Sequence, residues 1–310
     1  MNWRPAAALR VVRERARVYL QIRAFFNTRG YLEVDTPVLM PATSTDVHIG
    51  SLEVSCAGRQ LFLQTSPEYA MKRLLAAGSG SIFQIGHAFR QDEQGRLHNP
   101  EFSLLEWYRE GYDYQQLMDE MELLIISLSL RQCDFSRITY RQLFQQSLGL
   151  VIDDIGLMQL RAECSRRIPG CEPQDLDFDQ CLDLLLVMVI APEMRGYQFV
   201  YDYPLSQAAL ARVSGSDASV AERFELFYNG VELANGFSEL TDATQQRTRF
   251  ESDNLARAQK GLPQHDIDEF LLAALDHGLE DCAGVALGLD RLLMVLLDLD
   301  SIDQVLTFRV

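Results

Sequence analysis

The sequence of 310 residues is long enough to bury one large hydrophobic core or two modest ones. No apolar run approaches the roughly 20 residues that a membrane span needs, and arginines interrupt the apolar N-terminal stretch, so we expect a cytoplasmic protein without a signal peptide. The formal net charge of −16 argues against bulk nucleic-acid binding, which requires clustered lysine and arginine.

The cysteines form no C-x-x-C pair and have no histidine at metal-ligand spacing. This pattern predicts reduced thiols and makes a structural zinc site improbable. The six residues are Cys56, Cys133, Cys164, Cys171, Cys181 and Cys282.

The N-terminal segment has helical periodicity. Apolar residues recur at three- and four-residue steps from Ala6 to Thr28, and Gly30 is a natural end for the predicted helix. Residues 31–39 predict a short strand, in which Pro37 suits an edge or an end. A long helix followed by an edge strand is common in dimer interfaces and equally common as a packing unit.

Residues 52–64 predict two strands joined near Ala57 and Gly58, and residues 69–77 predict a helix. Pro67 is tolerated near the start of that helix. Glu68 then lies at the helix N-terminus, where the helix dipole favours a carboxylate. This capping role is enough by itself to explain Glu68.

Residues 81–108 predict a strand, a polar loop and a second strand. Side chains alternate between the two faces of a strand, so every second residue shares a face. On the first strand these are Gln84, Gly86, Ala88 and Arg90, and on the second they are Phe102, Leu104, Glu106 and Tyr108. This face combines small residues, an arginine, an aromatic ring and a carboxylate. The combination predicts a binding site for a charged, partly flat ligand. An ordinary amphipathic hairpin is the alternative.

The middle of the chain is less informative. Residues 114–130 and 140–147 predict helices, and residues 197–203 predict a strand. Residues 150–195 are acidic, and they show helical periodicity only from 178 to 190. No Gly/Ser-rich linker separates this part, so we expect one domain over residues 1–310 with 150–195 as an elaboration of it.

A second hairpin is centred on Asn229-Gly230, the strongest short-range signal for a tight turn of the primed type. Counting outward from the turn pairs Phe227 with Glu232 and Glu225 with Ala234. Glu225 and Glu232 would then share a face, roughly 7–8 Å apart along the diagonal. Two carboxylates at that separation suit Mg²⁺ bound to substrate phosphates, although a solvated outer face is also consistent with the pattern.

The C-terminal part predicts helices over residues 247–260 and 268–277, followed by a strand and a final helix. Gly284, Ala286 and Gly288 fall at every second position, which leaves one strand face nearly bare. Arg291 lies in the first turn of the final helix. A bare strand beside a helix start allows a ligand to lie against the backbone.

The segments from Phe89 to Tyr108 and from Gly284 to Arg291 resemble motifs 2 and 3 of the class II aminoacyl-tRNA synthetases. YLEVDTPVL at 31–39 resembles motif 1, and TSPE at 65–68 with ELANGFSEL at 232–240 narrows the resemblance to the lysyl branch. The resemblance covers nearly the whole chain. It implies an α+β fold, in which an antiparallel β-sheet is flanked by helices.

No segment resembles the N-terminal OB fold that reads the anticodon in lysyl-tRNA synthetases. The sequence is therefore similar to the stand-alone paralogs that attach (R)-β-lysine to elongation factor P. The resemblance implies a homodimer and a two-step ligation. ATP and a lysine-like amino acid form an aminoacyl-adenylate and pyrophosphate, and the acyl group then passes to the ε-amine of a lysine on elongation factor P.

The resemblance also implies the nucleotide site. Arg90 would bind the α-phosphate of ATP and the carboxylate of the amino acid, and Arg291 would reach the γ-phosphate; these two are the expected catalytic residues. Phe102 would stack on the adenine, with Arg291 on its other face, and Glu225 with Glu232 would hold Mg²⁺. Further nucleotide contacts are implied for Gln91, Asp92, Asn99, Glu232, Leu233 and Gly288.

For the amino acid, the resemblance implies a pocket whose carboxylates meet the amino groups of lysine or β-lysine. The implied residues are Ser66, Pro67, Glu68, Glu106, Tyr108, Asn235, Glu239 and Ala286. Two positions depart from the family pattern. Asp92 stands in place of a glutamate and has a shorter reach. Ala286 stands where lysyl-tRNA synthetases tend to have glycine, and its extra methyl group is expected to change the preferred amino acid.

Two other functions fit parts of the pattern. A minimal lysyl-tRNA synthetase would aminoacylate bulk tRNA. A non-catalytic amino-acid sensor of the same origin would give no ATP–pyrophosphate exchange with any lysine isomer. Such sensors usually lose a phosphate-binding arginine or a metal carboxylate, whereas Arg90, Arg291, Glu225 and Glu232 are all present.

Overall fold

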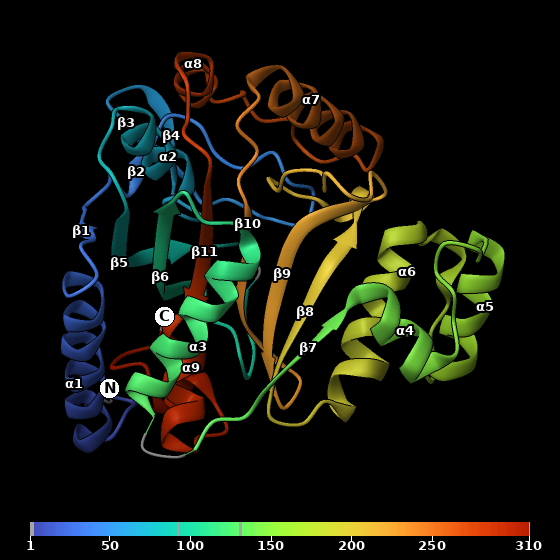
Figure 1. The fold of residues 1–310 in the computed structure, drawn as a ribbon, viewed down its shortest axis with the longest axis horizontal. Coiled ribbons are helices and arrows are strands. Elements are labelled where there is room, and N and C mark those ends of the chain that lie inside the picture. Colours follow the sequence, from blue (N-terminus) through green and yellow to red (C-terminus); the bar gives the residue numbers. More distant parts are fainter. Residues whose placement is uncertain (1–2, 92, 130–131, 310) are drawn as a thin grey trace. The chain divides into compact units, whose positions relative to one another are not determined.

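The computed structural model describes residues 3–91, 93–129 and 132–309. The chain divides into two compact units, Met1–Leu130 with Ser238–Val310 and Arg131–Phe237 (Figure 1). Within the described ranges, no helix is both long and apolar enough to span a membrane. All six cysteines are free thiols, in agreement with the prediction of reduced thiols. The organisation as a single catalytic domain stays a prediction.

Four strands of the first unit lie in the order β1 (Leu32–Glu33), β5 (Ile82–Phe89), β6 (Glu101–Glu110) and β11 (Cys282–Gly288). β1 is parallel to β5, and the β5–β6 and β6–β11 pairs are antiparallel. A separate three-stranded sheet has the order β2 (Leu39–Met40), β4 (Arg59–Leu63) and β3 (Glu53–Cys56). The β5–β6, β6–β11, β2–β4 and β3–β4 pairs are antiparallel, and they confirm the expected fold class.

The strand predicted over residues 31–39 is wrong in extent. The segment forms two separate strands of two residues each, β1 and β2, instead of one continuous strand. Pro37 lies between them and has no N–H to donate to a ladder. The chain therefore joins one sheet with β1, leaves it, and enters the second sheet with β2.

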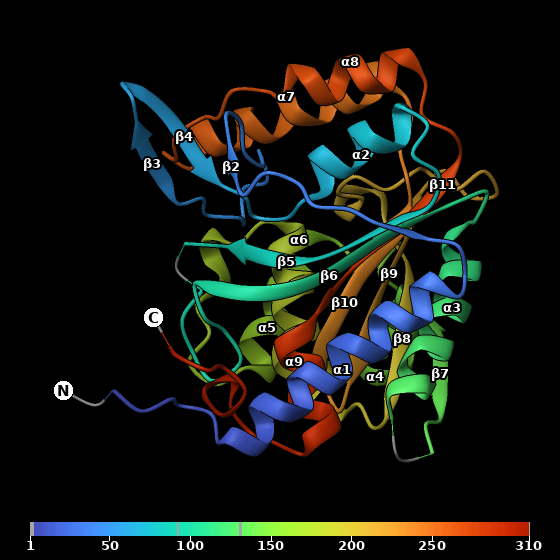
Figure 2. The ribbon, with the colours of Figure 1, turned by 90° about the vertical axis from the view of Figure 1, so that its left-hand side faces the viewer.

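Helices cover both faces of the β5–β6–β11 strands (Figure 2). α1 (Leu9–Asn27), α3 (Tyr114–Leu128) and α9 (Leu289–Leu297) lie on one side, and α2 (Glu68–Ala76), α7 (Ala243–Gln259) and α8 (Glu269–His277) on the other. The first side is an aromatic core, because the Phe26 ring on α1 stacks on Phe83 with 4.7 Å between centroids and contacts Trp107 at 5.3 Å. The predicted helix boundaries are confirmed to within a few residues.

The alternation predicted for the first hairpin is confirmed by the strand register. Glu106 on β6 lies opposite Gln84 on β5 and Ala286 on β11, and Tyr108 lies opposite Gly284. Phe83, Trp107 and Val285 form the corresponding row on the other face. We call the face that carries Gln84, Phe102, Glu106, Tyr108, Gly284 and Ala286 the site face.

The second unit contains the strands β10 (Val231–Ser238), β9 (Val220–Tyr228), β8 (Tyr197–Pro204) and β7 (Phe135–Thr139), in that order. The β7–β8 pair is parallel, and the β8–β9 and β9–β10 pairs are antiparallel. Its helices are α4 (Tyr140–Leu148), α5 (Leu157–Arg167) and α6 (Phe178–Leu185), with helical turns at Pro173–Asp175, Leu186–Ile190, Ala191–Glu193 and Leu205–Gln207. Helix α5 was not predicted, because it is polar and buries only Leu160 and Cys164.

The hairpin of β9 and β10 forms at Asn229-Gly230 as predicted, and both turn residues have positive φ. Phe227 lies opposite Glu232, but Glu225 lies opposite Asn235. The predicted pairing of Glu225 with Ala234 is therefore wrong. Leu233 is an additional, buried residue between Glu232 and Ala234, and it forms a β-bulge that shifts the register by one.

We predict that Gly230→Ala lowers the free energy of unfolding by about 2–5 kcal/mol. The residue has φ +80°, and an added Cβ would lie 2.1 Å from the carbonyl oxygen of Ala191. Gly58→Ala is the matched control, because Gly58 has φ +76° with no atom within 4 Å of an added Cβ. Thermal denaturation should show a clearly larger loss for Gly230→Ala, and equal losses would contradict the steric account.

Candidate active site

A group of acidic and polar side chains lies on the site face beneath helix α2. We call Ser66, Glu68, Lys72, Glu106, Tyr108 and Glu239 the carboxylate cluster. Ser66 Oγ donates to Glu106 Oε2 at 2.7 Å and accepts from the Glu68 N–H at 3.1 Å. Tyr108 donates to the other oxygen, Glu106 Oε1, at 2.7 Å. The start of α2 and the middle of β6 are thereby joined.

Lys72 lies one helical turn after Glu68 and is only 1% exposed. Its Nζ lies 2.6 Å from Glu68 Oε1 and 2.5 Å from Glu239 Oε2. Glu239 follows β10, and its backbone N–H binds the carbonyl of Cys282 on β11. The cluster thus combines side chains from α2, β6 and the segment after β10.

The cluster has an excess of negative charge, since three carboxylates face one ammonium group. The pKa of Glu106 is raised to about 7, first by burial and then by the Glu68 carboxylate, although Tyr108 and Ser66 hydrogen bonds oppose this. Burial also raises the pKa of Glu239 to about 8, against the opposing effect of Lys72. These carboxyl groups hold protons near neutral pH, and a cationic ligand would favour their release.

Two buried oxygens beside these acids have unused hydrogen-bonding capacity, and Gly284 on β11 packs closely against the cluster. Gln84 is buried next to Glu106, and neither its Oε1 nor Oε1 of Glu239 has a hydrogen-bond partner among the described residues. At Gly284 an added Cβ would lie 2.3 Å from the Tyr108 ring and 2.4 Å from Glu239 Oε1. Unpaired acceptors in a buried site favour a ligand that donates hydrogen bonds.

A second group lies at the loop end of the same hairpin and is rich in arginine. The Arg90 guanidinium lies 5.1 Å from the centre of the Phe102 ring and donates to the Thr65 carbonyl and to Glu93. Arg291 contacts His98 Nε2 at 2.7 Å and the Leu97 carbonyl. Guanidinium groups beside an aromatic ring suit an anionic ligand with a flat ring system.

The two groups meet at adjacent residues. The Thr65 carbonyl binds Arg90, whereas Ser66 binds Glu106. A site for an anion is therefore next to a site for cations. An amino acid carries both charges, so this juxtaposition suits an amino acid whose carboxylate faces Arg90 and whose amino groups face the carboxylate cluster.

Helix α9 is held in place by a buried ion pair beneath the sheet. Asp290 is 2% exposed, accepts from the Ser103 N–H at 2.7 Å, and pairs with Arg15 on α1. Arg15 also donates to the Val305 carbonyl at 2.9 Å. Asp290 thus fixes the start of α9 against β6 and sets the direction of the adjacent Arg291.

Glu225 and Glu232 belong to the second unit. Glu225 is paired with Arg223 at 2.6 Å, and Asn235 accepts a hydrogen bond from the same arginine. Burial raises the pKa of Glu225 to about 7; Arg223 opposes the shift and the nearby Glu232 adds to it. Glu232 is exposed.

A group of three or more His, Cys, Asp and Glu side chains that could hold a metal ion is not found among the described residues. Mg²⁺, however, is commonly held by one or two carboxylates together with substrate phosphates. Glu225 and Glu232 repel each other, and a cation bound by both would relieve this repulsion. Arg223, which pairs with Glu225, relieves part of it already.

The structure brings together most, but not all, of the residues expected for the amino acid. Ser66, Glu68, Glu106, Tyr108 and Glu239 join in one cluster, with Ala286 beside it and Pro67 capping α2. Asn235 lies in the second unit. Its expected role, like the individual roles of the other residues, stays a prediction.

Among the expected nucleotide residues, Gln91 is exposed and pairs with Gly50 through its backbone. Asn99 is buried and donates to the Glu101 carbonyl at 2.7 Å. Gly288 directly precedes α9, and Leu233 is the bulge residue of β10. Asp92 lies outside the described residues.

Sequence reasoning missed Lys72 and the full meaning of Gln84. Lys72 was detectable as a lysine four residues after Glu68 on the same face of a helix that also buries Met71 and Leu75. Gln84 was placed on the correct face, but its unpaired oxygen becomes evident only from the packing.

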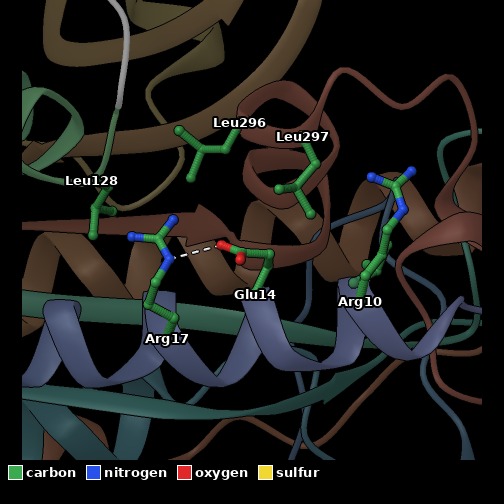
Figure 3. Close-up of a pocket in the computed structure, with 7 residues that line it drawn as sticks. Arg10, Glu14, Arg17, Leu128, Leu296 and Leu297 are labelled. Carbon is green, nitrogen blue, oxygen red and sulfur yellow. Dashed lines mark hydrogen bonds and ion pairs between the residues drawn. The ribbon is translucent and has the colours of Figure 1, made fainter.

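A separate cavity of about 290 Å³ lies on the other side of the first unit's strands, between α1, α3 and α9 (Figure 3). Arg17 donates to Glu14 at 2.7 Å across its wall, so these two charges satisfy each other. The cavity is lined by Arg10, Val11, Glu14, Arg17, Leu128, Leu296 and Leu297. It contains none of the predicted site residues.

Comparison with known proteins agrees with the site. The family model described as "tRNA synthetases class II (D, K and N)" matches residues 1–309. The "Elongation factor P--(R)-beta-lysine ligase" of Yersinia enterocolitica is 46% identical over 319 aligned residues, which cover 100% of this chain and 98% of that protein. Proteins with the same description from Vibrio parahaemolyticus and Vibrio cholerae are 46% and 45% identical, covering 99% of this chain and 98% and 97% of their own lengths.

We predict that Gly284→Ala weakens binding of L-lysine by about tenfold or more, because overpacking a filled site typically costs roughly 1–3 kcal/mol. The added methyl group would displace Tyr108 or Glu239, and both are buried. Calorimetric titration measures the affinity, and ATP affinity should change little. Gly156→Ala is the control, since no atom lies within 4 Å of its added Cβ. Unchanged lysine affinity in a folded Gly284→Ala variant would contradict the assignment of the pocket.

Proposed function

We propose that this chain, which belongs to the class II tRNA synthetases of the D, K and N group, is an ATP-dependent ligase that acts on elongation factor P. Its full-length similarity to the (R)-β-lysine ligases supports this branch of the family. The observation that carries the proposal is the buried carboxylate cluster next to Arg90. Such a site selects an amino acid with two amino groups.

In the first step, an oxygen of the amino acid carboxylate attacks the α-phosphorus of ATP, and pyrophosphate leaves. Arg90 would orient the carboxylate and neutralise the negative charge that develops on the α-phosphate. Phe102 and Arg291 would hold the adenine and the γ-phosphate. No side chain needs to act as a covalent nucleophile, because positioning and charge neutralisation provide the acceleration.

Mg²⁺ would be held by Glu225 and Glu232. When bound, it supplies positive charge to the phosphate oxygens. The bulge at Leu233 allows Asn235, rather than Ala234, to lie opposite Glu225, and Asn235 with Arg223 orients that carboxylate. We expect Leu233 and Asn235 to influence nucleotide and amino-acid binding through this arrangement.

The amino acid is proposed to be (R)-β-lysine or lysine. Its ammonium groups would meet Glu68, Glu106 and Glu239, where Lys72 leaves two of the three negative charges uncompensated. Ala286 lies directly opposite Glu106 and narrows the pocket by one methyl group compared with glycine. Moving one amino group along the substrate backbone is the kind of change that a methyl group at this position would detect.

In the second step, the neutral ε-amine of a lysine on elongation factor P attacks the acyl carbon of the adenylate. An amide bond forms, AMP leaves with the electron pair of the broken acyl–phosphate bond, and the amine loses a proton. We propose that this reaction takes place in the cytoplasm and that the enzyme is a homodimer. A net charge of −16 is consistent with a protein acceptor rather than with bulk nucleic acid.

Incubation of the purified protein with ATP, Mg²⁺, (R)-β-lysine and elongation factor P tests the proposal. Intact-mass measurement should show the addition of one lysyl group to elongation factor P, accompanied by release of AMP and pyrophosphate. Arg90→Gln should reduce the rate by about 10²–10³ because a charge-stabilising group is lost. Arg96→Gln, at an exposed arginine of the same loop, should leave it unchanged.

Two outcomes would favour the alternatives. Aminoacylation of bulk tRNA with unmodified elongation factor P would identify a minimal lysyl-tRNA synthetase. No ATP–pyrophosphate exchange with L-lysine or with either β-lysine enantiomer would identify a non-catalytic sensor.

A further inference from the structure

Lys72 is a buried ammonium group that forms ion pairs with two acids of the carboxylate cluster. It is 1% exposed, and Glu239, which it contacts, is also 1% exposed. The spacing of four residues places Lys72 and Glu68 on the same face of α2, with Nζ 2.6 Å from Glu68 Oε1. The other lysine of the chain, Lys260, is exposed at the end of α7.

Stability alone gives no reason for a lysine at this position. Transfer of an ammonium group from water into a protein interior costs several kcal/mol, and an ion pair often fails to recover this cost. Helix α2 buries Met71 and Leu75 beside Lys72, so an apolar residue would continue the same face. A buried ammonium group that does not stabilise the fold points to a role for Lys72 in the pocket.

The groups that face Lys72 come from four elements. Glu68 belongs to α2, Glu106 to β6, Glu239 to the segment after β10, and Cys282 to β11. Three of these four groups are carboxylates and the fourth is a thiol, while Tyr108 on β6 donates to Glu106. Lys72 is the one positive charge of the carboxylate cluster.

We propose that Lys72 is a positioning residue that aligns Glu239 in the empty pocket and favours its ionisation when the amino acid binds. This inference rests on the proposed function. Lys72 holds one oxygen of each carboxylate. Glu239 Oε1 has no hydrogen-bond partner among the described residues and lies close to Gly284, 2.4 Å from where an added Cβ would be.

Lys72 also affects the protonation of Glu239. Burial raises the pKa of Glu239 to about 8, whereas Lys72 lowers it. Although burial alone would lower the pKa of Lys72, Glu239 and Glu68 raise it above its usual value, so the ammonium stays charged. Loss of Lys72 would raise the pKa of Glu239 further. The ionised pocket would then form only at higher pH.

The test is the pH dependence of kcat/KM for (R)-β-lysine in ATP–pyrophosphate exchange, between about pH 6 and pH 9. In wild type, kcat/KM should rise with pH as the pocket acids ionise. In Lys72→Met and Lys72→Gln, the rise should move upward by about one pH unit or more, and KM for the amino acid should increase about tenfold at neutral pH. KM for ATP should change less than about twofold.

The two variants separate charge from packing, because methionine preserves apolar packing and glutamine retains a hydrogen-bond donor. Lys260→Met is the control at an exposed lysine. Thermal denaturation confirms folding of each variant. A uniform fall in kcat/KM at all pH values, with the profile unshifted, would overturn the proposal in favour of a purely structural role. Failure of both variants to fold would also overturn it.

The proposed function itself is tested separately, by the activity of the wild-type protein on elongation factor P. A wild-type enzyme that modifies this acceptor, together with an unshifted profile in the variants, would reject only the role of Lys72. An inactive wild-type protein would reject the function.

Discussion

A buried imbalance of charge is the constraint around which the first unit is organised. Three carboxylates from α2, β6 and the segment after β10 surround the ammonium of Lys72, and the closest contacts are 2.5–2.6 Å. Buried charges without partners are costly, so the pocket takes up protons when it is empty. A ligand with two ammonium groups removes this cost. The selectivity proposed for the site follows from the same physics that makes the empty site unfavourable.

The antiparallel register of β5, β6 and β11 makes this arrangement possible. Alternation directs Glu106 and Tyr108 toward α2, while Trp107 between them points into the aromatic core with Phe26 and Phe83. The polar pocket is thus supported from behind by rigid apolar packing. On the same apolar side, the Asp290–Arg15 pair fixes the start of α9 and places Arg291 against Leu97 and His98 of the hairpin loop.

Much of this could be predicted from sequence because the signals are local. Period-two alternation correctly predicted that Glu106 and Tyr108 share a face, and Asn229-Gly230 correctly predicted the turn of the second hairpin. The bare positions at Gly284 and Ala286 marked the strand that borders the pocket. The family resemblance assigned roles to these residues, and the full-length comparisons confirm the family.

The remaining features depend on contacts between distant segments, which local patterns do not contain. The bulge at Leu233 is stabilised by burial of that side chain, so counting from the turn misplaced Glu225 by one residue. Helix α5 is polar and depends on the core around Leu160, and residues 31–39 are divided between two sheets. The role of Lys72 depends on its ion pair with Glu239, which is distant in the sequence and could not be predicted from local patterns.

Proton release on ligand binding tests the central claim most directly. Calorimetric titration of the wild-type protein with (R)-β-lysine at about pH 7, in buffers of different ionisation enthalpy, gives the number of protons exchanged. With Glu106 and Glu239 raised to about 7 and about 8 in the empty pocket, we predict release of roughly one proton per bound molecule. Binding with no net proton release would show that these carboxyl groups are already ionised, and it would contradict the account of a pocket whose unbalanced charge selects a doubly cationic amino acid.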